Sequence, residues 1–179
     1  MKAIILAAGL GNRLLPLTED KPKCLIEFSG KTLLDRLLKT FKSGGINDIV
    51  LVIGHKGEKI NNVDLNLVKN EKYSRTGIMH SLFCAREKLE KTVIISYGDI
   101  IFENSVLEKL LESNYDITAV VDKKWERYWK LRTDKPLSDA ESLLLDKKNF
   151  ITNIGEKNLE SFDKICGQFI GLIMFQNKG

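Results

Sequence analysis

Short apolar runs rich in β-branched residues alternate with amphipathic stretches along the first two thirds of this chain. Such runs are typical of buried strands, and they lie over residues 2–6, 48–53, 65–68, 92–96 and 116–121. Apolar stripes at helical spacing fall between several of them, over residues 32–42, 78–89 and 106–111. Strands separated by helices are typical of βαβ units, so we predict an α/β fold with a mainly parallel, Rossmann-like sheet flanked by helices.

The pattern changes after about Asp122, where the residues KKWERYWKLR form an aromatic and basic stretch. Apolar residues return over 140–145 and 150–154, on either side of a turn at residues 146–149. This arrangement predicts an antiparallel hairpin subdomain beside the parallel sheet. A length of 179 residues suits one ordinary domain, so residues 1–179 are expected to form a single domain.

The charge balance is mildly positive, with 28 Lys and Arg residues against 24 Asp and Glu residues and a net charge of +4. This excess suits a phosphate-bearing small molecule as partner, and it is too weak and dispersed to indicate nucleic-acid binding. No apolar run approaches the roughly 20 residues that a bilayer span requires. Cys24, Cys84 and Cys166 form no C-x-x-C motif, which argues against a disulfide framework or a zinc site and favours a reducing, cytoplasmic location.

A glycine-rich segment follows the first predicted strand, with the sequence AAGLGNRLLP over residues 7–16. Ligands of parallel α/β sheets bind beyond the carboxyl ends of the strands, so a site is expected here. Gly9 and Gly11 let backbone N–H groups approach an anion, and Arg13 and Lys23 can neutralise phosphate oxygens. The segment lacks the third glycine of a dinucleotide-binding fingerprint and the Gly-Lys-Ser/Thr end of a Walker A loop.

A second candidate, Asp99, follows the predicted strand over residues 92–96, at the same edge of the sheet. Its carboxylate can hold Mg²⁺, which prefers oxygen ligands and bridges protein to phosphate. The alternative is a turn aspartate that caps the helix that follows. Thr76 and Ser81 lie where a loop leads into a helix, and they either read a ligand by hydrogen bonds or form a purely structural helix cap.

Residues 4–34 have the sequence IILAAGLGNRLLPLTEDKPKCLIEFSGKTLL. They resemble the opening of the nucleoside-triphosphate transferases, the superfamily of sugar-phosphate nucleotidyltransferases and cytidylyltransferases. Its pattern is L-A-A-G-x-G-x-R-x-x-P-x-T, followed by P-K-x-L and G-K. Later segments resemble the phosphocholine and 2-aminoethylphosphonate cytidylyltransferase branch, over residues 70–82, 97–100, 125–141 and 167–172. The resemblance runs essentially from end to end and implies a fold like that of the nucleotide-diphosphosugar transferases.

The resemblance also implies a nucleotide site around the glycine-rich loop. Arg13, Lys23 and Asp99 match catalytic positions of the family, and Asp99 matches its metal-binding position for Mg²⁺. The residues expected to bind the nucleotide are Leu6, Ala7, Ala8, Gly9, Gly11, Asn12, Arg13, Lys23, Thr76 and Ser81. Within this set, Gly11, Arg13 and Lys23 are expected to grip the triphosphate, while Ser81 and the preceding loop contact the pyrimidine.

By the same resemblance, residues 1–121 form the nucleotide-binding half and residues 122–179 the acceptor-side part. The family's second metal carboxylate normally lies beyond a strand like that over residues 169–175, and we identify no residue here for that role. Either the acceptor-side part is truncated, which is what we expect, or the metal site is built differently.

Aromatic and charged residues are expected to bind the acceptor: Trp125, Trp129, Arg132, Asp139 and Glu141. Aromatic faces attract ammonium groups, and Asp139 and Glu141 add anionic partners for an amine. This combination fits phosphocholine or 2-aminoethylphosphonate better than a neutral hexose phosphate. In the alternative reading, the tryptophans pack the hairpin onto the sheet.

The expected reaction is nucleotidyl transfer, in which an acceptor oxygen attacks the α-phosphorus of an NTP, for which the resemblance favours CTP, and pyrophosphate leaves. A phosphate or phosphonate oxygen is already anionic at neutral pH, so positioning and electrostatics suffice without a protein nucleophile. One alternative is a sugar-1-phosphate nucleotidyltransferase that uses UTP, dTTP or CTP. The other is a non-catalytic nucleotide-binding module. The sequence is compatible with a homo-oligomer.

Overall fold

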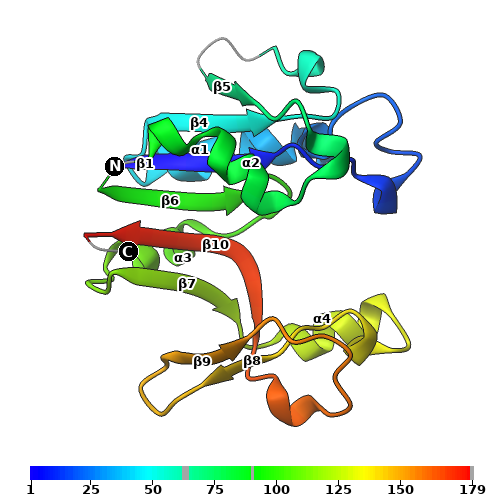
Figure 1. The fold of residues 1–179 in the computed structure, drawn as a ribbon, viewed down its shortest axis with the longest axis vertical. Helices are drawn as coiled ribbons and strands as arrows, with labels where there is room; N and C mark the ends of the chain where they lie inside the picture. Colours follow the sequence, from blue (N-terminus) through cyan, green and yellow to red (C-terminus); the bar gives the residue numbers. More distant parts are fainter. Residues whose placement is uncertain (62–64, 90, 178–179) are drawn as a thin grey trace. The chain divides into compact units, whose positions relative to one another are not determined.

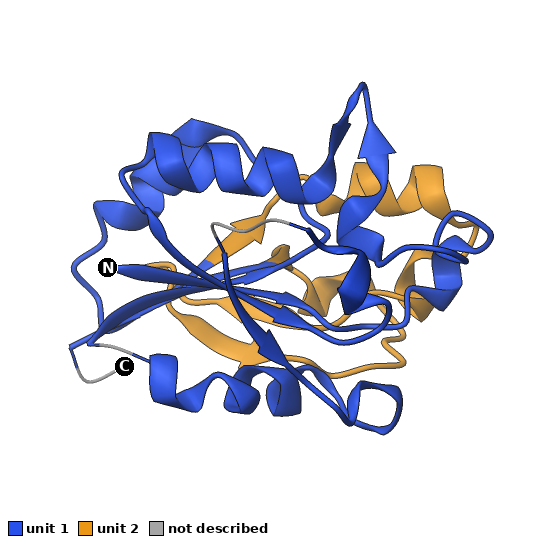
Figure 2. Ribbon diagram, turned by 90° about the horizontal axis from the view of Figure 1, so that it is seen from above, with its two compact units in different colours: residues 1–119, 171–179 blue, residues 120–170 orange. Residues whose placement is uncertain are grey.

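The computed structural model describes residues 1–61, 65–89 and 91–177. These residues form two compact units, which Figure 2 shows in separate colours. The first unit consists of residues 1–119 together with the chain from Gly171 onward, and the second is Val120–Ile170.

A mainly parallel sheet forms the centre of the first unit (Figure 1). Its parallel strands are β1 (Lys2–Ala7), β4 (Asp48–Ile53), β5 (Asn66–Lys69) and β6 (Thr92–Tyr97). Two further strands, β10 (Gln168–Gln176), which is antiparallel to β6, and β7 (Ile117–Asp122), complete the order β5-β4-β1-β6-β10-β7. The predicted α/β fold with a mainly parallel sheet is confirmed.

The central strands are buried on both faces, as expected for a parallel sheet between helices. One face carries a core cluster that consists of Ile4, Leu6, Val50, Val52, Ala85, Val93 and Ile95. Alternate residues of the same strands point to the other face, because side chains alternate along a strand, and Ile5, Leu51 and Ile94 are fully buried there.

Three α-helices belong to the first unit: α1 (Leu33–Ser43), α2 (Ile78–Cys84) and α3 (Asn104–Leu111). The apolar stripe over residues 78–89 predicts a longer helix than the structure has. The α-helix ends at Cys84 and a 3₁₀ turn over Arg86–Lys88 follows, because the chain has to turn back before β6 begins. The unit also holds a short antiparallel hairpin of β2 (Glu27–Phe28) and β3 (Lys31–Thr32).

The second unit contains α4 (Trp125–Arg132) and a hairpin of β8 (Leu143–Leu145) and β9 (Ile151–Ile154). The hairpin is antiparallel, with Leu143 opposite Ile154, which confirms the predicted hairpin subdomain. Its core consists of Trp125, Ala140 and Ile165, with Trp129, Leu137 and Leu159 packed against them. None of the helices in the described ranges has the length and apolar character needed to cross a membrane.

Candidate functional site

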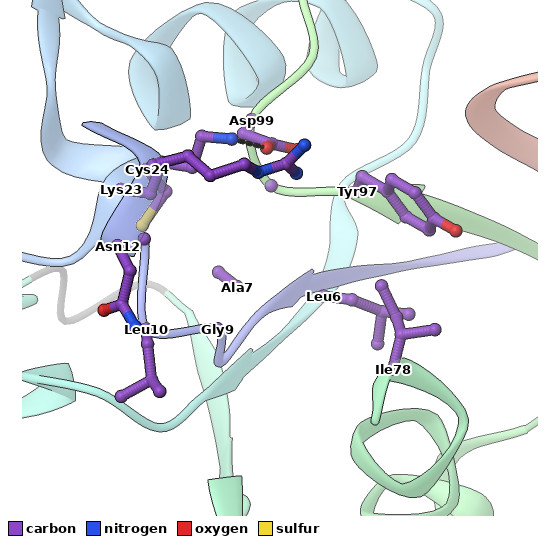
Figure 3. A pocket seen from close by; sticks show the side chains of 13 residues that line it. Leu6, Ala7, Gly9, Leu10, Asn12, Lys23, Cys24, Ile78, Tyr97 and Asp99 are labelled. Carbon is purple, nitrogen blue, oxygen red and sulfur yellow. Dashed lines mark hydrogen bonds and ion pairs between the residues drawn. The ribbon is translucent and has the colours of Figure 1, made fainter. Parts of the chain in front are cut away.

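A cavity of about 360 Å³ lies at the carboxyl ends of β1 and β6 in the first unit (Figure 3). Its lining comes from separate parts of the sequence: Leu6 and Ala7 of β1, residues 9–13 of the glycine-rich loop, Lys23 and Cys24, Ile78 of α2, and residues 97–99. The fold thus brings the glycine-rich loop together with Arg13, Lys23 and Asp99 around one space.

The two ends of the cavity differ in chemistry. In Figure 3, Lys23 and Asp99 lie side by side at one end, whereas Leu6, Ile78 and Tyr97 gather at the other. A cavity with a charged end and an apolar end suits a ligand that is built in the same way, such as an organic molecule that carries phosphates.

The two glycines of the loop take different parts in its geometry. Gly11 has φ of +73°, and its carbonyl accepts a hydrogen bond of 3.0 Å from the buried Thr18 hydroxyl. A Cβ atom at Gly11 would come within 2.9 Å of Thr18 Cγ2. At Gly9, a Cβ atom would meet nothing within 4 Å. Gly11 therefore shapes the turn, while Gly9 leaves its backbone open to the cavity.

Asp99 is placed by the close contact between the ends of β1 and β6. The register pairs Leu6 with Tyr97, and the Gly98 N–H donates to the Leu6 carbonyl at 2.9 Å. A Cβ atom at Gly98 would lie 2.8 Å from Ala7 Cβ, so only glycine lets the two strand ends approach this closely. Asp99, at the start of the loop that follows β6, consequently lies beside the glycine-rich turn.

Lys23 and Asp99 form an ion pair, with the Lys23 ammonium donating to the Asp99 carboxylate. Both side chains are 29% exposed, so solvent screens their attraction. A partly exposed pair of this kind contributes little stability, and each partner can exchange the other for a ligand. The cation can thus turn to an anionic ligand and the carboxylate to a cationic one.

The neighbouring Cys24 is only 1% exposed, although it borders the cavity. Burial raises the pKa of its thiol to about 12, and the nearby Asp99 carboxylate also raises it, against the lowering effect of a backbone hydrogen bond. A thiol with such a pKa stays protonated at neutral pH and does not act as a nucleophile. Cys24 therefore gives the cavity no activated thiol.

Three residues of the expected nucleotide set do not line the cavity. Ala8 is buried behind it, and its carbonyl accepts the His55 N–H at 3.2 Å. Thr76 and Ser81 accept hydrogen bonds from Asn70 Nδ2, at 3.1 and 3.0 Å. Ile78, between these two in sequence, does line the cavity, so their segment forms part of its wall.

The residues expected to bind the acceptor lie in the second unit, where most of them gather around Trp129. Its ring is 5.7 Å from that of Trp125, and the Arg132 guanidinium lies 5.6 Å from its centroid. Arg132 also pairs with Asp139 at 2.9 Å, whereas Glu141 pairs with Lys157 at 3.4 Å. The two tryptophan rings thus meet edge to face, and Trp129 also contacts the protein's own Arg132.

A metal site would rest on Asp99. Within the described ranges, no three side chains of His, Cys, Asp or Glu gather where they could share a metal ion. Mg²⁺ is usually held by one or two carboxylates together with substrate phosphates and waters. A single carboxylate beside a phosphate-binding loop therefore fits a Mg²⁺ ion that arrives with a nucleotide.

The carboxyl edge of this parallel sheet carries an open glycine turn, cations and a carboxylate. These features are typical of nucleotide-binding α/β proteins. Residues 3–152 match the family model of the MobA-like NTP transferase domain, and the chain belongs to this family. The resemblance to nucleotidyltransferases that the sequence predicts is confirmed.

Two similar proteins are cytidylyltransferases by name, and a third is a CTP transferase by name. The chain is 38% identical to the CTP:phosphoglutamine cytidylyltransferase of Campylobacter jejuni, over 98% of this chain and 73% of that protein. It is 37% identical to the choline-phosphate cytidylyltransferase of Streptococcus pneumoniae, over 64% of this chain and 52% of that protein, about half its length. The solved inositol-1-phosphate CTP transferase from T. maritima has a TM-score of 0.75 and 28% identity, over 99% of this chain and 71% of that one.

Several lining residues are not among those that the sequence singles out for a role in the site. Leu10, Cys24, Ile78, Tyr97 and Gly98 all border the cavity. Most are sequence neighbours of predicted site residues, and Tyr97 and Gly98 directly precede Asp99, so adjacency to the motif is the signal that could have found them. Ile78 has the same signal, because it lies between Thr76 and Ser81 of the expected nucleotide set.

Proposed function

We propose that this protein is a cytidylyltransferase that joins CTP to a phosphorylated small molecule and releases pyrophosphate. The observation that carries the proposal is the single cavity in which the glycine-rich loop, Lys23 and Asp99 meet. Membership of the MobA-like NTP transferase family supports the reaction class. The choice of CTP is supported by the names of the C. jejuni, S. pneumoniae and T. maritima proteins.

On the nucleotide side, we propose that the open backbone at Gly9, the turn at Gly11 and the Arg13 and Lys23 cations bind the triphosphate. Arg offers a planar fork of N–H donors and Lys a compact charge, and both suit phosphate oxygens. Leu6, Ala7 and Asn12 line the same cavity, and Ala8 supports it from behind. Thr76 and Ser81 would act on the pyrimidine side, in the segment that leads to Ile78.

In the reaction, a phosphate oxygen of the acceptor forms a bond to the α-phosphorus of CTP. The bond from that phosphorus to the pyrophosphate oxygen breaks, and pyrophosphate leaves with its electron pair. Two anions have to approach each other, so the chain's main task is to hold them in line and offset their repulsion. Arg13 and Lys23 would do so at the phosphates, with no proton transfer required of Cys24.

Asp99 is the residue that would hold Mg²⁺ in this proposal. When bound, the ion would neutralise charge on the α-phosphate and on the departing pyrophosphate. The ion pair between Asp99 and Lys23 keeps both groups at the cavity wall before ligands arrive. Lys23 would then release Asp99 and turn to the triphosphate.

We propose that the first unit binds the nucleotide and that the second supplies acceptor-side residues: Trp125, Trp129, Arg132, Asp139 and Glu141. Support for this set is its grouping within one unit, around Trp129. The ion pairs of Arg132 with Asp139 and of Glu141 with Lys157 are solvent-exposed, so we expect the acceptor to replace them with contacts of its own. Pyrophosphate release measured with a panel of phosphocholine, 2-aminoethylphosphonate, phosphoglutamine and hexose 1-phosphates identifies the chemical class of the acceptor.

The test is pyrophosphate release by two single variants, Lys23→Ala and Asp99→Ala. Each should reduce turnover at least about 10²-fold, the typical loss when one electrostatic contact to a transition state is removed. The matched control is Asp48→Ala, which removes a carboxylate paired with Lys2 at 3.3 Å, at the amino end of β4. This variant should turn over at a rate close to that of the wild type.

Near-normal turnover by either cavity variant would contradict the proposal. A wild-type protein that binds CTP with Mg²⁺ in calorimetry, and releases no pyrophosphate with any acceptor of the panel, would instead be a binding module. Turnover with UTP or dTTP and a hexose 1-phosphate, in preference to CTP, would identify a sugar-1-phosphate nucleotidyltransferase.

We also propose a cytoplasmic location. It is supported by the free thiols of Cys24, Cys84 and Cys166, because extracellular proteins usually oxidise such residues in pairs. The proposed partners are CTP and the acceptor, without nucleic acid.

A further inference from the structure

Asn70 is a fully buried polar residue that directly follows β5, and the reaction proposed above assigns it no role. Its backbone N–H donates to the Ile53 carbonyl at 2.8 Å, and its carbonyl accepts the Tyr73 N–H at 3.3 Å. Its side-chain Oδ1 accepts the Lys72 N–H at 2.9 Å. Asn70 thus fixes the turn that follows β5 to the carboxyl end of β4.

The side-chain amide of Asn70 also holds two hydroxyl groups. Nδ2 donates to Thr76 Oγ1 at 3.1 Å and to Ser81 Oγ at 3.0 Å, so every donor and acceptor of the residue has a partner. Thr76 Oγ1 in turn donates to the Lys72 carbonyl at 2.8 Å, which closes a ring through Lys72, Asn70 and Thr76.

Backbone groups fix the direction of every hydrogen bond in this ring. The Lys72 N–H can only donate, so it orients Oδ1 of Asn70 toward the turn and Nδ2 toward the two hydroxyls. The Lys72 carbonyl can only accept, so it takes the single proton of the Thr76 hydroxyl. While the ring is intact, Thr76 has no proton to donate to a ligand.

The ring is connected to the cavity in two places. Thr76 and Ser81 flank Ile78, the residue of α2 that lines the cavity. On the other side, a Cβ atom at Gly54 would come within 2.6 Å of both Tyr73 Cβ and the Ala8 carbonyl, so Gly54 packs tightly against the turn and against the start of the glycine-rich loop and links the two. A change in the ring should therefore move the cavity wall.

We propose that Asn70 is a positioning residue for the nucleotide: it holds the segment over residues 70–81, which contributes Ile78 to the cavity wall, and Thr76 and Ser81 act through it. This inference rests on the proposed function and deepens it, because in it the two hydroxyls hold the cavity wall in place and do not contact the base. Loss of a residue that contacts the base should alter the choice between bases. Loss of a residue that positions the wall should weaken the binding of all pyrimidine nucleotides by a similar factor.

The experiment measures the Kd of CTP and of UTP by calorimetry with Mg²⁺, together with Tm, for the whole chain. Asn70→Ala should weaken CTP binding at least about tenfold, since the buried Ser81 hydroxyl, the half-buried Thr76 hydroxyl and the Lys72 N–H each lose Asn70 as a partner. It should weaken UTP binding by the same factor. Ser81→Ala should act in the same direction, and the double variant Asn70→Ala/Ser81→Ala should bind no more weakly than Asn70→Ala alone.

The matched control is Gln176→Ala, which removes another bridging side-chain amide. Gln176 Nε2 donates to the carbonyls of Ser113 and Tyr115 at 2.8 and 2.9 Å, and Gln176 pairs with Thr92 at the amino end of β6, at the opposite edge of the sheet from Asp99. Its loss should lower Tm while the Kd of CTP stays within about twofold. This separates positioning from a general loss of stability.

If Asn70→Ala does not fold, Thr76→Val provides the same test, because it opens the ring with little change of shape. The inference is overturned if the folded ring variants bind CTP as the wild type does, or if Ser81→Ala changes the ratio of the CTP and UTP affinities independently of Asn70. A wild-type protein that binds no CTP overturns the proposed function and this inference together, and so differs from a failure of the ring variants alone.

Discussion

Gly9 and Gly11 lie two positions apart in one motif, and the structure gives them opposite reasons to be glycine. Gly11 has φ of +73° and no room for a Cβ atom beside Thr18, so it is required by the fold of the loop. Gly9 has no positive φ and open space around it, so the fold itself would accept a methyl group there. We therefore expect Gly9 to be required by the ligand rather than by the fold.

A pair of alanine substitutions tests this difference. Gly11→Ala should lower the free energy of unfolding by about 1–2 kcal/mol, because an L-residue is strained in the left-handed region. Gly9→Ala should leave stability within about 0.5 kcal/mol of the wild type. It should weaken CTP binding about tenfold or more, because the methyl group displaces the phosphates from the backbone.

Denaturant unfolding and calorimetry with CTP and Mg²⁺ measure the two effects. Equal losses of stability in both variants would contradict the assignment of Gly9 to the ligand, as would a Gly9→Ala variant that binds CTP normally.

At the same scale, the sequence predicts the charged end of the cavity well and the apolar end poorly. Arg13 and Lys23 belong to a recognisable motif, and Asp99 follows a recognisable strand. The contact between Lys23 and Asp99 joins residues 76 positions apart and depends on the parallel register of β1 and β6. Adjacency to Thr76 and Asp99 points to Ile78 and Tyr97, but no local pattern encodes the orientation of α2 and β6 that brings these residues to the cavity.

Among the elements, α1 shows how completely a helix start can be defined locally. Thr32 Oγ1 accepts the Asp35 N–H at 3.0 Å, and the Asp35 carboxylate accepts the Thr32 N–H at 3.2 Å, so the two residues form a reciprocal capping box. The helix then buries Leu34, Leu37 and Phe41 against the sheet. The cap lies outside the set of residues that line the cavity.

Thr32→Ala should therefore lower stability without affecting turnover. Loss of an N-cap typically costs about 1 kcal/mol, which corresponds to a decrease in Tm of about 2–4 °C for a chain of this size. Thermal unfolding and a pyrophosphate-release assay check the two parts. A fall in turnover beyond twofold at a temperature where the variant is folded would show that α1 reaches the site.

The sequence predicts that most elements exist, but it does not predict which elements lie next to each other in the fold. The central strands and α1 are evident from apolar patterns, since each pattern is local. The order of the strands is not, because nothing local tells β1 to lie between β4 and β6. The antiparallel pairing of β10 with β6 likewise depends on tertiary packing. It brings the chain from Gly171 onward back into the first unit.

For the molecule as a whole, all lining residues of the cavity belong to the first unit, so nucleotide binding should stabilise that unit. The net charge of +4 should add a weak attraction for CTP that salt screens, and we expect the specific contribution to come from Arg13 and Lys23. A ligand that binds only the folded state raises stability according to its concentration and Kd.

CTP at about 100 times its Kd, with Mg²⁺, should stabilise the protein by about 2.7 kcal/mol and raise Tm by about 5–10 °C. Removal of Mg²⁺ with EDTA should reduce this increase in Tm, since Asp99 then has no cation to share with the phosphates. Lys23→Ala should nearly abolish the increase. Thermal unfolding at matched ionic strength measures each case. An equal shift with EDTA in the wild type would mean that Asp99 does not hold the ion, whereas a full shift in Lys23→Ala would place the triphosphate elsewhere.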